Sequence, residues 1–200
     1  MKSGKKTKEK LTEEAIKLFV RRGYHGTTID NIVREVGLTK GAFYSHFTSK
    51  GELLLEIIER YKGKSLSEIK RLATENPGNA LEKLNQIISF NALFAAQNEN
   101  LCVFLAFLST ELTTDVDFEP VLKAVYGEYR TVISNLMQEG ISQGLLKEEL
   151  DPELAAITFI ALHDGSLHQW IVNRNSIDSS EYVRTFRKVF FSGISKEKTG

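Results

Sequence analysis

A short segment of the sequence combines residue types that suit contact with the bases of DNA. Residues 39–42 join one lysine to small neighbours. A lysine can donate hydrogen bonds to guanine O6 or N7, and alanine can contact a thymine methyl group. Small side chains also let a backbone come close to the base edges. We therefore expect base contacts from four residues: Thr39, Lys40, Gly41 and Ala42.

Polar and basic side chains around this segment suit the DNA backbone instead. Thr28 begins a helical pattern, and the hydroxyl and free N–H groups of a helix N-terminus bind phosphate oxygens. The other candidates are long polar side chains near the segment and lysines of the N-terminal arm, which could equally serve only solubility. The predicted phosphate contacts are Thr28, Tyr44, His46, Lys50, Lys5 and Lys6.

Two short helical patterns joined by a glycine turn would position these residues. Residues 29–36 repeat apolar side chains at helical spacing, and Gly37 ends that pattern. The second helix covers 40–47, where Phe43 and Phe47 lie four residues apart and can both face a scaffold. Two helices joined in this way form a helix-turn-helix.

The rest of the chain is also predicted to be helical. No segment alternates polar and apolar residues in the manner of a strand, so we expect an all-α fold of about nine helices. A capping box at Ser49 and Glu52 opens a long helix that connects the two parts of the chain. The predicted domains are a DNA-binding domain over 1–48, a connecting helix over 49–74, and an effector-binding and dimerisation domain over 75–200.

Charge is distributed unevenly along the 200 residues, although the net charge is zero. The first 50 residues carry eleven Lys or Arg against five Asp or Glu, and the remainder carries 15 against 21. A basic N-terminal part on an acidic body indicates a polyanion-binding head. A lysine-rich terminus that is merely solvated would give the same balance.

Several other classes of protein are disfavoured. The one cysteine, Cys102, excludes an internal disulfide and a multi-cysteine zinc site, and its apolar neighbours favour a buried thiol. The longest uncharged run, over 84–98, is shorter than the roughly 20 apolar residues that span a bilayer. With no signal peptide expected, we predict a soluble, cytoplasmic protein without a membrane partner.

Hydrolase-type residues occur together in one later segment, but their geometry is unsuitable. On a helix, His163 and Ser166 point one way and Asp164 about 100° away. His163 and His168 are five residues apart and do not share a face, so they do not suggest a metal site. We predict no enzymatic activity, no metal and no cofactor; a helical enzyme stays the alternative from another class.

The spacing over residues 10–57 resembles the N-terminal part of the TetR family of transcriptional regulators. Val33 and Val36 stand where the family often has alanine. The resemblance implies a homodimer on a palindromic double-stranded DNA operator, a small-molecule effector pocket in the helical body, and dimerisation through the last two long helices. The positions that carry it are Phe19, Gly23, Tyr24, Thr27, Thr28, Ile32, Gly37, Leu38, Thr39, Lys40, Gly41, Tyr44, Ser45, His46, Phe47, Lys50 and Leu53.

The function that follows is a ligand-responsive regulator, expected to be a repressor that a small, mostly apolar effector releases by shifting the helix over 49–74. An activator or a ligand-blind regulator of the same fold is the alternative. Aromatic residues are numerous in the body and suit such an effector, although core packing explains each of them alone. The predicted pocket residues are Phe90, Phe94, Phe104, Phe107, Tyr126, Tyr129, Phe159, His163 and Trp170.

The helix over 152–173 carries two opposed stripes, one for a pocket and one for a partner subunit. Small Gly165 suits a close helix crossing, so its stripe is assigned to the subunit interface, with the monomer core as the alternative. The predicted interface residues are Leu162, Gly165, Gln169, Val172, Phe186, Val189 and Phe190.

Overall fold

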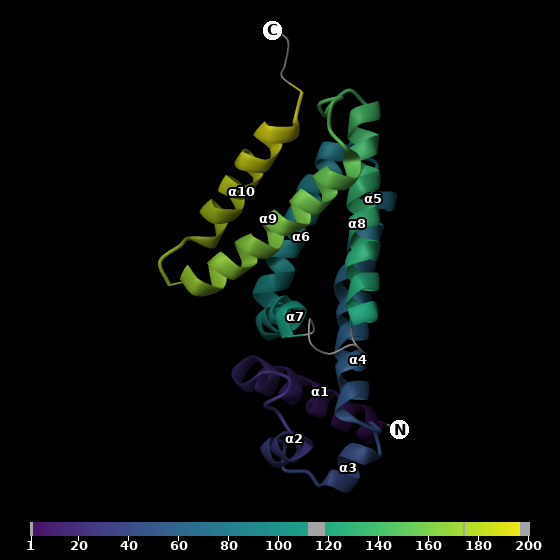
Figure 1. Ribbon diagram of the computed structural model, residues 1–200, viewed down its shortest axis with the longest axis vertical. Coiled ribbons are helices and arrows are strands. Elements are labelled where there is room, and N and C mark those ends of the chain that lie inside the picture. The colour runs from purple at the N-terminus through teal and green to yellow at the C-terminus, as the bar shows by residue number, and fades with distance from the viewer. Residues whose placement is uncertain (1, 112–118, 174, 197–200) are drawn as a thin grey trace. The chain divides into compact units, whose positions relative to one another are not determined.

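The computed structural model describes residues 2–111, 119–173 and 175–196, which form helices joined by short loops (Figure 1). If the continuous run of α4, η1 and α5 counts as one helix, these residues form nine helices, and their one extended pairing is a bridge between Leu146 and Ser195. The all-α prediction is confirmed. The bounds are α1 Lys2–Arg22, α2 Ile29–Glu35, α3 Lys40–Tyr44, α4 Lys50–Tyr61, η1 Lys62–Leu66, α5 Ser67–Glu75, α6 Ala80–Gln97, α7 Glu99–Glu111, α8 Glu119–Ser142, α9 Pro152–Asn173 and α10 Ser179–Ile194.

The helices belong to two compact units. Helices α1 to α4 and α7 make up the first unit, and α5, α6, α8, α9 and α10 make up the second. The division falls between Lys64 and Ser65, inside the predicted connecting helix over 49–74. The first unit therefore takes in α7, which the sequence analysis had assigned to the domain over 75–200.

Helix α7 joins the first unit through aromatic packing on α1. The rings of Phe19 and Phe104 have centroids 5.2 Å apart, and Phe19 also meets Tyr24 edge-on at 5.3 Å. All three side chains are buried. Burial of a large aromatic side chain is among the strongest contributions to a core. The contact therefore places Phe104 in the core of the first unit.

The sequence predicted one long connecting helix over 49–74, but this segment is not a regular helix throughout. Between α4 and α5 the chain forms a π-helical turn, η1, at Lys62–Leu66. A π-turn inserts one extra residue, which rotates all that follows by about 100° about the helix axis. Leu53, Leu54, Ile57 and Ile58 of α4 are buried, and so is Ile69 of α5. The apolar residues of α4 are thus buried in the first unit and Ile69 of α5 in the second.

The cap of α4 also differs by one residue from the predicted capping box. Ser49 Oγ accepts a hydrogen bond from the Glu52 N–H at 3.0 Å, as predicted. The Glu52 carboxylate, however, accepts from the N–H and the hydroxyl of Thr48, at 2.5 and 2.7 Å, and these bonds lower the pKa of Glu52. The result is that the loop before α4 is tied to its first turn.

Phe159 of α9 lies at the centre of the second unit. It is fully buried and packs against Tyr129 of α8 and against Phe186 and Phe190 of α10. Aliphatic residues of α5, α6 and α8 complete this core. One aromatic side chain thus holds three of the helices of this unit together.

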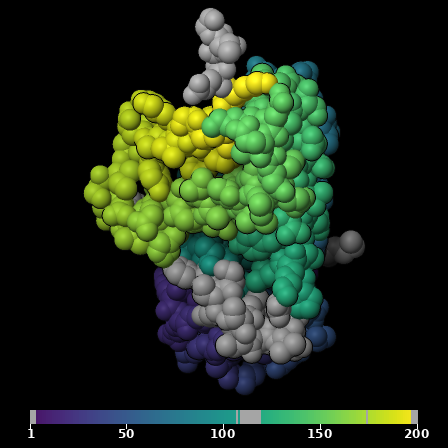
Figure 2. Space-filling model, turned by 45° about the horizontal axis from the view of Figure 1, so that its top comes forward, coloured from purple at the N-terminus to yellow at the C-terminus, as the bar shows by residue number. Residues whose placement is uncertain are grey.

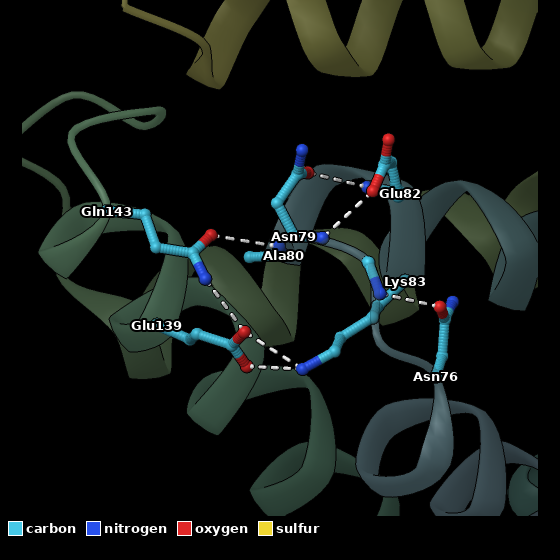
Figure 3. A network of polar contacts seen from close by, with 8 residues as sticks. Asn76, Asn79, Ala80, Glu82, Lys83, Glu139 and Gln143 are labelled. Atoms are coloured by element: carbon cyan, nitrogen blue, oxygen red, sulfur yellow. Dashed lines mark hydrogen bonds and ion pairs between the residues drawn. The ribbon is translucent and has the colours of Figure 1, made fainter.

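A polar network fixes the beginning of α6 on α8 (Figure 3). Lys83 Nζ lies 2.9 and 3.1 Å from the two carboxylate oxygens of Glu139. Gln143 donates to Glu139 at 2.9 Å and accepts from the Ala80 N–H at 3.0 Å. The first turn of α6 is therefore anchored on α8.

The thiol of Cys102 is buried on α7, and its burial raises its pKa to about 12. None of the helices in the described part of the chain is long and apolar enough to cross a membrane.

The buried Cys102 gives a test of the packing of α7. Its ordinary pKa of 9.0 rises to about 12, so the thiolate fraction at pH 8 falls about a thousandfold, and burial blocks access as well. We expect the native protein to react with a thiol reagent such as DTNB at pH 8 at least about a thousandfold more slowly than the protein unfolded in guanidinium chloride. Rapid, complete labelling of the native protein would contradict the burial of Cys102.

Candidate DNA-binding surface and effector cavity

The first unit contains two short helices whose ends are fixed by side chains. Thr28 Oγ1 accepts from the Asn31 N–H at 3.2 Å, and Asn31 Oδ1 accepts from the Thr28 N–H at 3.0 Å, which starts α2. Gly37 ends α2 with a φ of +67°, a conformation that glycine adopts without a steric penalty. Thr39 Oγ1 then accepts from the Ala42 N–H at 3.2 Å and starts α3. This is a helix-turn-helix.

Helix α3 is held from one side and exposed on the other. Phe43 and Phe47 are 0% and 2% exposed, and their rings lie 5.5 Å apart in the core. Tyr44, by contrast, is 53% exposed, and Gly41 is exposed as well. The side of α3 that carries the predicted base-contacting residues is therefore open to a partner.

Gly41 of α3 is a glycine that the fold does not require. A Cβ built on it would meet only Thr39 Oγ1, at an ordinary 3.7 Å, and its φ is not positive. Glycine inside a helix costs about 0.5–1 kcal/mol relative to alanine. The fold alone therefore gives no reason for a glycine at this position.

Lys40 is paired within the helix-turn-helix. Its ammonium lies 2.9 Å from the Asp30 carboxylate of α2, and the hydrogen bond to Asp30 raises the pKa of Lys40. Both side chains are more than half exposed. Exposed ion pairs contribute little to stability. A DNA base or phosphate can therefore replace Asp30 as the partner of Lys40 at small cost.

Lys50 has a structural role that the sequence did not indicate. Its ammonium donates to the carbonyl oxygens of Tyr24 and Thr27 at 2.7 and 2.9 Å, and it lies 4.2 Å from the centre of the Tyr24 ring. These bonds tie the loop between α1 and α2 to the first residue of α4. The predicted phosphate contact would have to use the third N–H of the same ammonium group.

The remaining predicted phosphate contacts lie at or near the surface. Thr28, Lys5 and Lys6 are exposed, and His46 is half-buried. A Cβ on Gly4 would lie 3.6 Å from the His46 ring, so the start of α1 passes close to His46. The two lysines belong to α1, which begins at Lys2, and not to the free arm that the sequence analysis considered.

The second unit contains a cavity of about 550 Å³ between α6, α9 and α10. Trp170 and His163 of α9 line it, and Arg184 and Arg187 of α10 contribute the two cations. No aspartate or glutamate of the described ranges 2–111, 119–173 and 175–196 lines it. Most of the apolar lining comes from α6 and α9: Ile88, Ala92, Leu93, Ala95, Ala96 and Leu167.

Comparison with known proteins finds family models that match both the part with the helix-turn-helix and the part with the cavity. The family model for bacterial regulatory proteins of the tetR family matches residues 11–57, which include α2 and α3. The model for the C-terminal part of BetI-type transcriptional repressors matches residues 80–189, more than half of the chain. The chain belongs to the TetR family. It is a DNA-binding transcriptional regulator and not an enzyme.

Individual relatives are similar over nearly the whole chain. The fatty acid metabolism regulator protein of Bacillus subtilis is 24% identical over 186 residues, 92% of this chain and 93% of that protein. The transcriptional repressor BepR of Brucella suis is 26% identical over 176 residues, 86% and 84% of the two chains. The crystal structure of the MbdR regulator from Azoarcus sp. CIB matches with a TM-score of 0.85 and 26% identity, over 94% of this chain and 98% of that one.

The aromatic residues predicted for the effector pocket of this TetR-family protein lie in several places. His163 and Trp170 line the cavity. Five others do not: Phe90 and Phe94 pack on each other, Tyr129 and Phe159 are core residues, and the Tyr126 hydroxyl donates to Asp164. Phe104 lies in the first unit, and the side chain of Phe107 lies outside the part of the chain that the structure describes.

Sequence analysis missed the contribution of α10 to the cavity. Arg184, Arg187, Tyr182 and Val183 of α10 line it. They lie about ninety residues after the lining residues of α6, so no local pattern could bring the two helices together. The one available signal was the apolar spacing of α10, which the analysis assigned to the subunit interface.

A row of exposed apolar side chains follows α9 and continues on α10. Leu162, Val172 and Val189 are 40%, 67% and 63% exposed, and Gly165 and Gln169 are exposed beside them. Figure 2 shows α9 (light green) and α10 (yellow) next to one another at the surface. Two further members of this exposed face, which the sequence analysis did not name, are Leu154 and Ile157.

Two of the predicted interface residues face inward. Phe190 is 4% exposed and packs against Phe159, and half-buried Phe186 lines the cavity. The prediction is corrected at these two positions, because the aromatic rings of α10 fill the core while the opposite side of that helix carries Val189. A helix in this position has an inner and an outer stripe, and spacing alone did not distinguish them.

The position of Lys50 leads to a test that separates a structural role from a phosphate contact. The variant Lys50→Met removes two hydrogen bonds from a charged donor, so we expect a loss of about 1–3 kcal/mol in the free energy of unfolding. A lysine that neutralises a phosphate also contributes about one unit to the slope of log affinity against log salt. We expect that slope to be unchanged in the folded variant, in DNA-binding titrations at several salt concentrations. A variant of unchanged stability and reduced slope would show that Lys50 binds phosphate.

Proposed function

We propose that this protein is a repressor that binds a palindromic operator as a homodimer and leaves it when a small, mostly apolar effector occupies the cavity of the second unit. The observation that supports the proposal is the presence, in one chain, of a helix-turn-helix with an exposed second helix and of a separate cavity of about 550 Å³. Cavities of 300–1,000 Å³ with a mostly apolar lining are typical of small-molecule sites.

Helix α3 is the proposed recognition helix. Its exposed side would contact bases through Thr39, Lys40, Gly41 and Ala42, with Lys40 exchanging Asp30 for a DNA acceptor. Phosphate contacts would come from the exposed groups that surround it: Thr28, Tyr44, His46, Lys5 and Lys6. Lys50 is left out of this set because its ammonium already binds two carbonyl oxygens inside the unit.

The exposed apolar face of α9 and α10 is the proposed dimer interface. Large apolar side chains that lie together on a surface mark a site of association. A twofold dimer would present two recognition helices, and an operator with half-sites one turn apart needs them about 34–36 Å from each other.

The proposed route from cavity to recognition helix runs through α6. This helix lines the cavity with residues that include Ala95 and Ala96, ends at Gln97, and is followed directly by α7 from Glu99. Helix α7 packs on α1 of the head through Phe104 and Phe19. A ligand that displaces α6 would therefore act on a segment that is continuous with the core of the DNA-binding unit. The π-turn η1 lies at the other connection, where it allows the helix to adjust.

Gly41 provides the test of DNA recognition. Its replacement by alanine creates no clash and removes a helix-destabilising residue, so we expect Gly41→Ala to be more stable by about 0.5–1 kcal/mol. The added methyl group would nevertheless stand where the backbone approaches the bases. We expect operator affinity to fall at least about tenfold in gel-shift titrations against an operator found by selection from random DNA.

A matched control is Gly127→Ala on α8, where an added Cβ also meets nothing within 4 Å. This variant should gain similar stability and bind the operator as the unmodified protein does. If Gly41→Ala bound operator with unchanged affinity, α3 would not be the recognition helix.

Leu162 provides the test of the dimer interface. In a twofold interface each substitution occurs once in each subunit, so Leu162→Glu would place two carboxylates in an apolar contact. We therefore expect it to weaken association at least about a hundredfold. Light scattering at 1 µM should then give the 22.6 kDa monomer, where the unmodified protein gives twice this mass.

The control for this variant is Leu55→Glu, at a leucine of similar exposure on α4. It should remain a dimer. A dimeric Leu162→Glu, or an unmodified protein that is monomeric at this concentration, would contradict the assignment of the exposed face of α9.

A further inference from the structure

The cavity of the second unit has an uneven charge. Among the described residues that line it, two are arginines and one is histidine, and none carries a carboxylate. Asp164 of α9, next to the lining residue His163, interacts with the Tyr126 hydroxyl at 3.3 Å and the His163 ring at 3.2 Å. The lining is therefore suited to an anion and unsuited to a cation.

The two arginines differ in their partners. Arg184 pairs with Glu181 of its own helix at 2.7 Å, and its side chain is 69% exposed, so solvent and a neighbour already satisfy its charge. Arg187 lies three residues further, about five sixths of a helix turn, and is half-buried. Within the part of the chain that the structure describes, it forms no ion pair with a carboxylate, and its one recorded hydrogen bond runs from Nη2 to Ser89 Oγ at 2.5 Å.

The Nε atom of Arg187 is buried and has no hydrogen-bond partner among the described residues. A buried donor without a partner is unfavourable, and more so when it belongs to a charged group. Nε and Nη2 form one edge of the planar guanidinium, and this edge binds both oxygens of a carboxylate through two parallel hydrogen bonds. Nη2 carries a second N–H besides the one that it donates to Ser89.

The surroundings of Arg187 are otherwise apolar. Ala92, Ala95 and Ala96 of α6 form a wall of small side chains, and Trp170 and Leu167 of α9 lie among the other lining residues. Small residues along one helix leave room for a flexible chain, which the cavity of about 550 Å³ can hold.

We propose that the effector is an amphiphilic carboxylic acid, whose carboxylate binds Nε and Nη2 of Arg187 and whose apolar chain lies against α6 and Trp170. This proposal rests on the proposed function and specifies the chemical class of its ligand. The bound carboxylate would supply the missing acceptor of Nε and would join α10 to α6, on which Ser89 lies.

The fluorescence of Trp170 can report ligand binding, because it is the one tryptophan of the sequence and lines the cavity. We would titrate the full-length protein with laurate and with 1-dodecanol, below the aggregation limit of each, and follow Trp170 fluorescence. The two compounds share the apolar chain and differ in the charged head. We expect laurate to bind about 10- to 100-fold more tightly, as the loss of charged hydrogen bonds predicts. Shorter acids should lose about fourfold in affinity for each methylene removed.

The variant Arg187→Gln should bind laurate no better than 1-dodecanol and should bind 1-dodecanol as the unmodified protein does. Arg184→Gln is the matched control and should keep the preference for laurate. Since the comparison of the two ligands on the unmodified protein needs no variant, a failure of Arg187→Gln to fold would leave that test intact.

Equal affinity of the unmodified protein for laurate and 1-dodecanol, or no response of Trp170 to either, would overturn the proposal. So would a folded Arg187→Gln that keeps the preference for laurate. The proposed function is judged separately, by operator binding and its loss in Gly41→Ala. If 1-dodecanol and laurate released the protein from the operator equally well, the proposal of ligand control would be supported. The proposal that Arg187 recognises a carboxylate would be contradicted.

Discussion

The DNA-binding surface depends on the burial of two phenylalanines behind a helix of five residues. An isolated helix shorter than about 12–15 residues is not stable in water, so α3 cannot keep its shape alone. Phe43 and Phe47 hold it, and each contributes about 1.5–3 kcal/mol by burial. Because all of this stabilisation acts from the inner side, the outer side is free to carry a glycine, which weakens the helix, and an exposed tyrosine. Gly41 is tolerated only because the anchors are so completely buried.

The same constraint explains why much of the positive charge of the head is directed inward. The segments around α3 must also keep their positions, and lysine side chains hold several of these segments. Lys50 binds the carbonyls before α2, Lys10 binds the Val36 carbonyl at 3.0 Å, and Lys8 lies 2.6 Å from Glu56 of α4. The basic excess that suggested a polyanion partner is therefore partly structural. Exposed basic residues of the same unit include Lys5 and Lys6 of α1, Arg34 of α2, and Lys40, whose partner Asp30 is itself exposed.

Local patterns predicted the parts of the structure that local interactions determine. The helix-turn-helix, its caps at Thr28 and Thr39 and the inward direction of Phe43 follow from spacing within twenty residues. The contacts that were missed join distant positions: Lys50 with Tyr24, Phe19 with Phe104, and Arg187 with Ser89 of α6. Spacing also cannot show which of two apolar stripes on α10 faces the core, and for this reason Phe190 was assigned to the wrong side.

In the proposed function, helix α10 takes part in both ligand binding and dimerisation. One of its sides carries Arg187 at the cavity, and another carries Val189 on the exposed face. A ligand can shift an equilibrium only by the difference in its affinity for the two states. A shift from 1:99 to 99:1 requires a difference of about ten-thousandfold. An apolar chain alone would bind α6 in many positions and discriminate weakly, whereas a carboxylate held by two parallel bonds on α10 requires one spacing between the two helices. A partner subunit packed on the outer side of α10 would keep Arg187 in place, so that the helix free to respond is α6, which leads directly into the core of the DNA-binding unit.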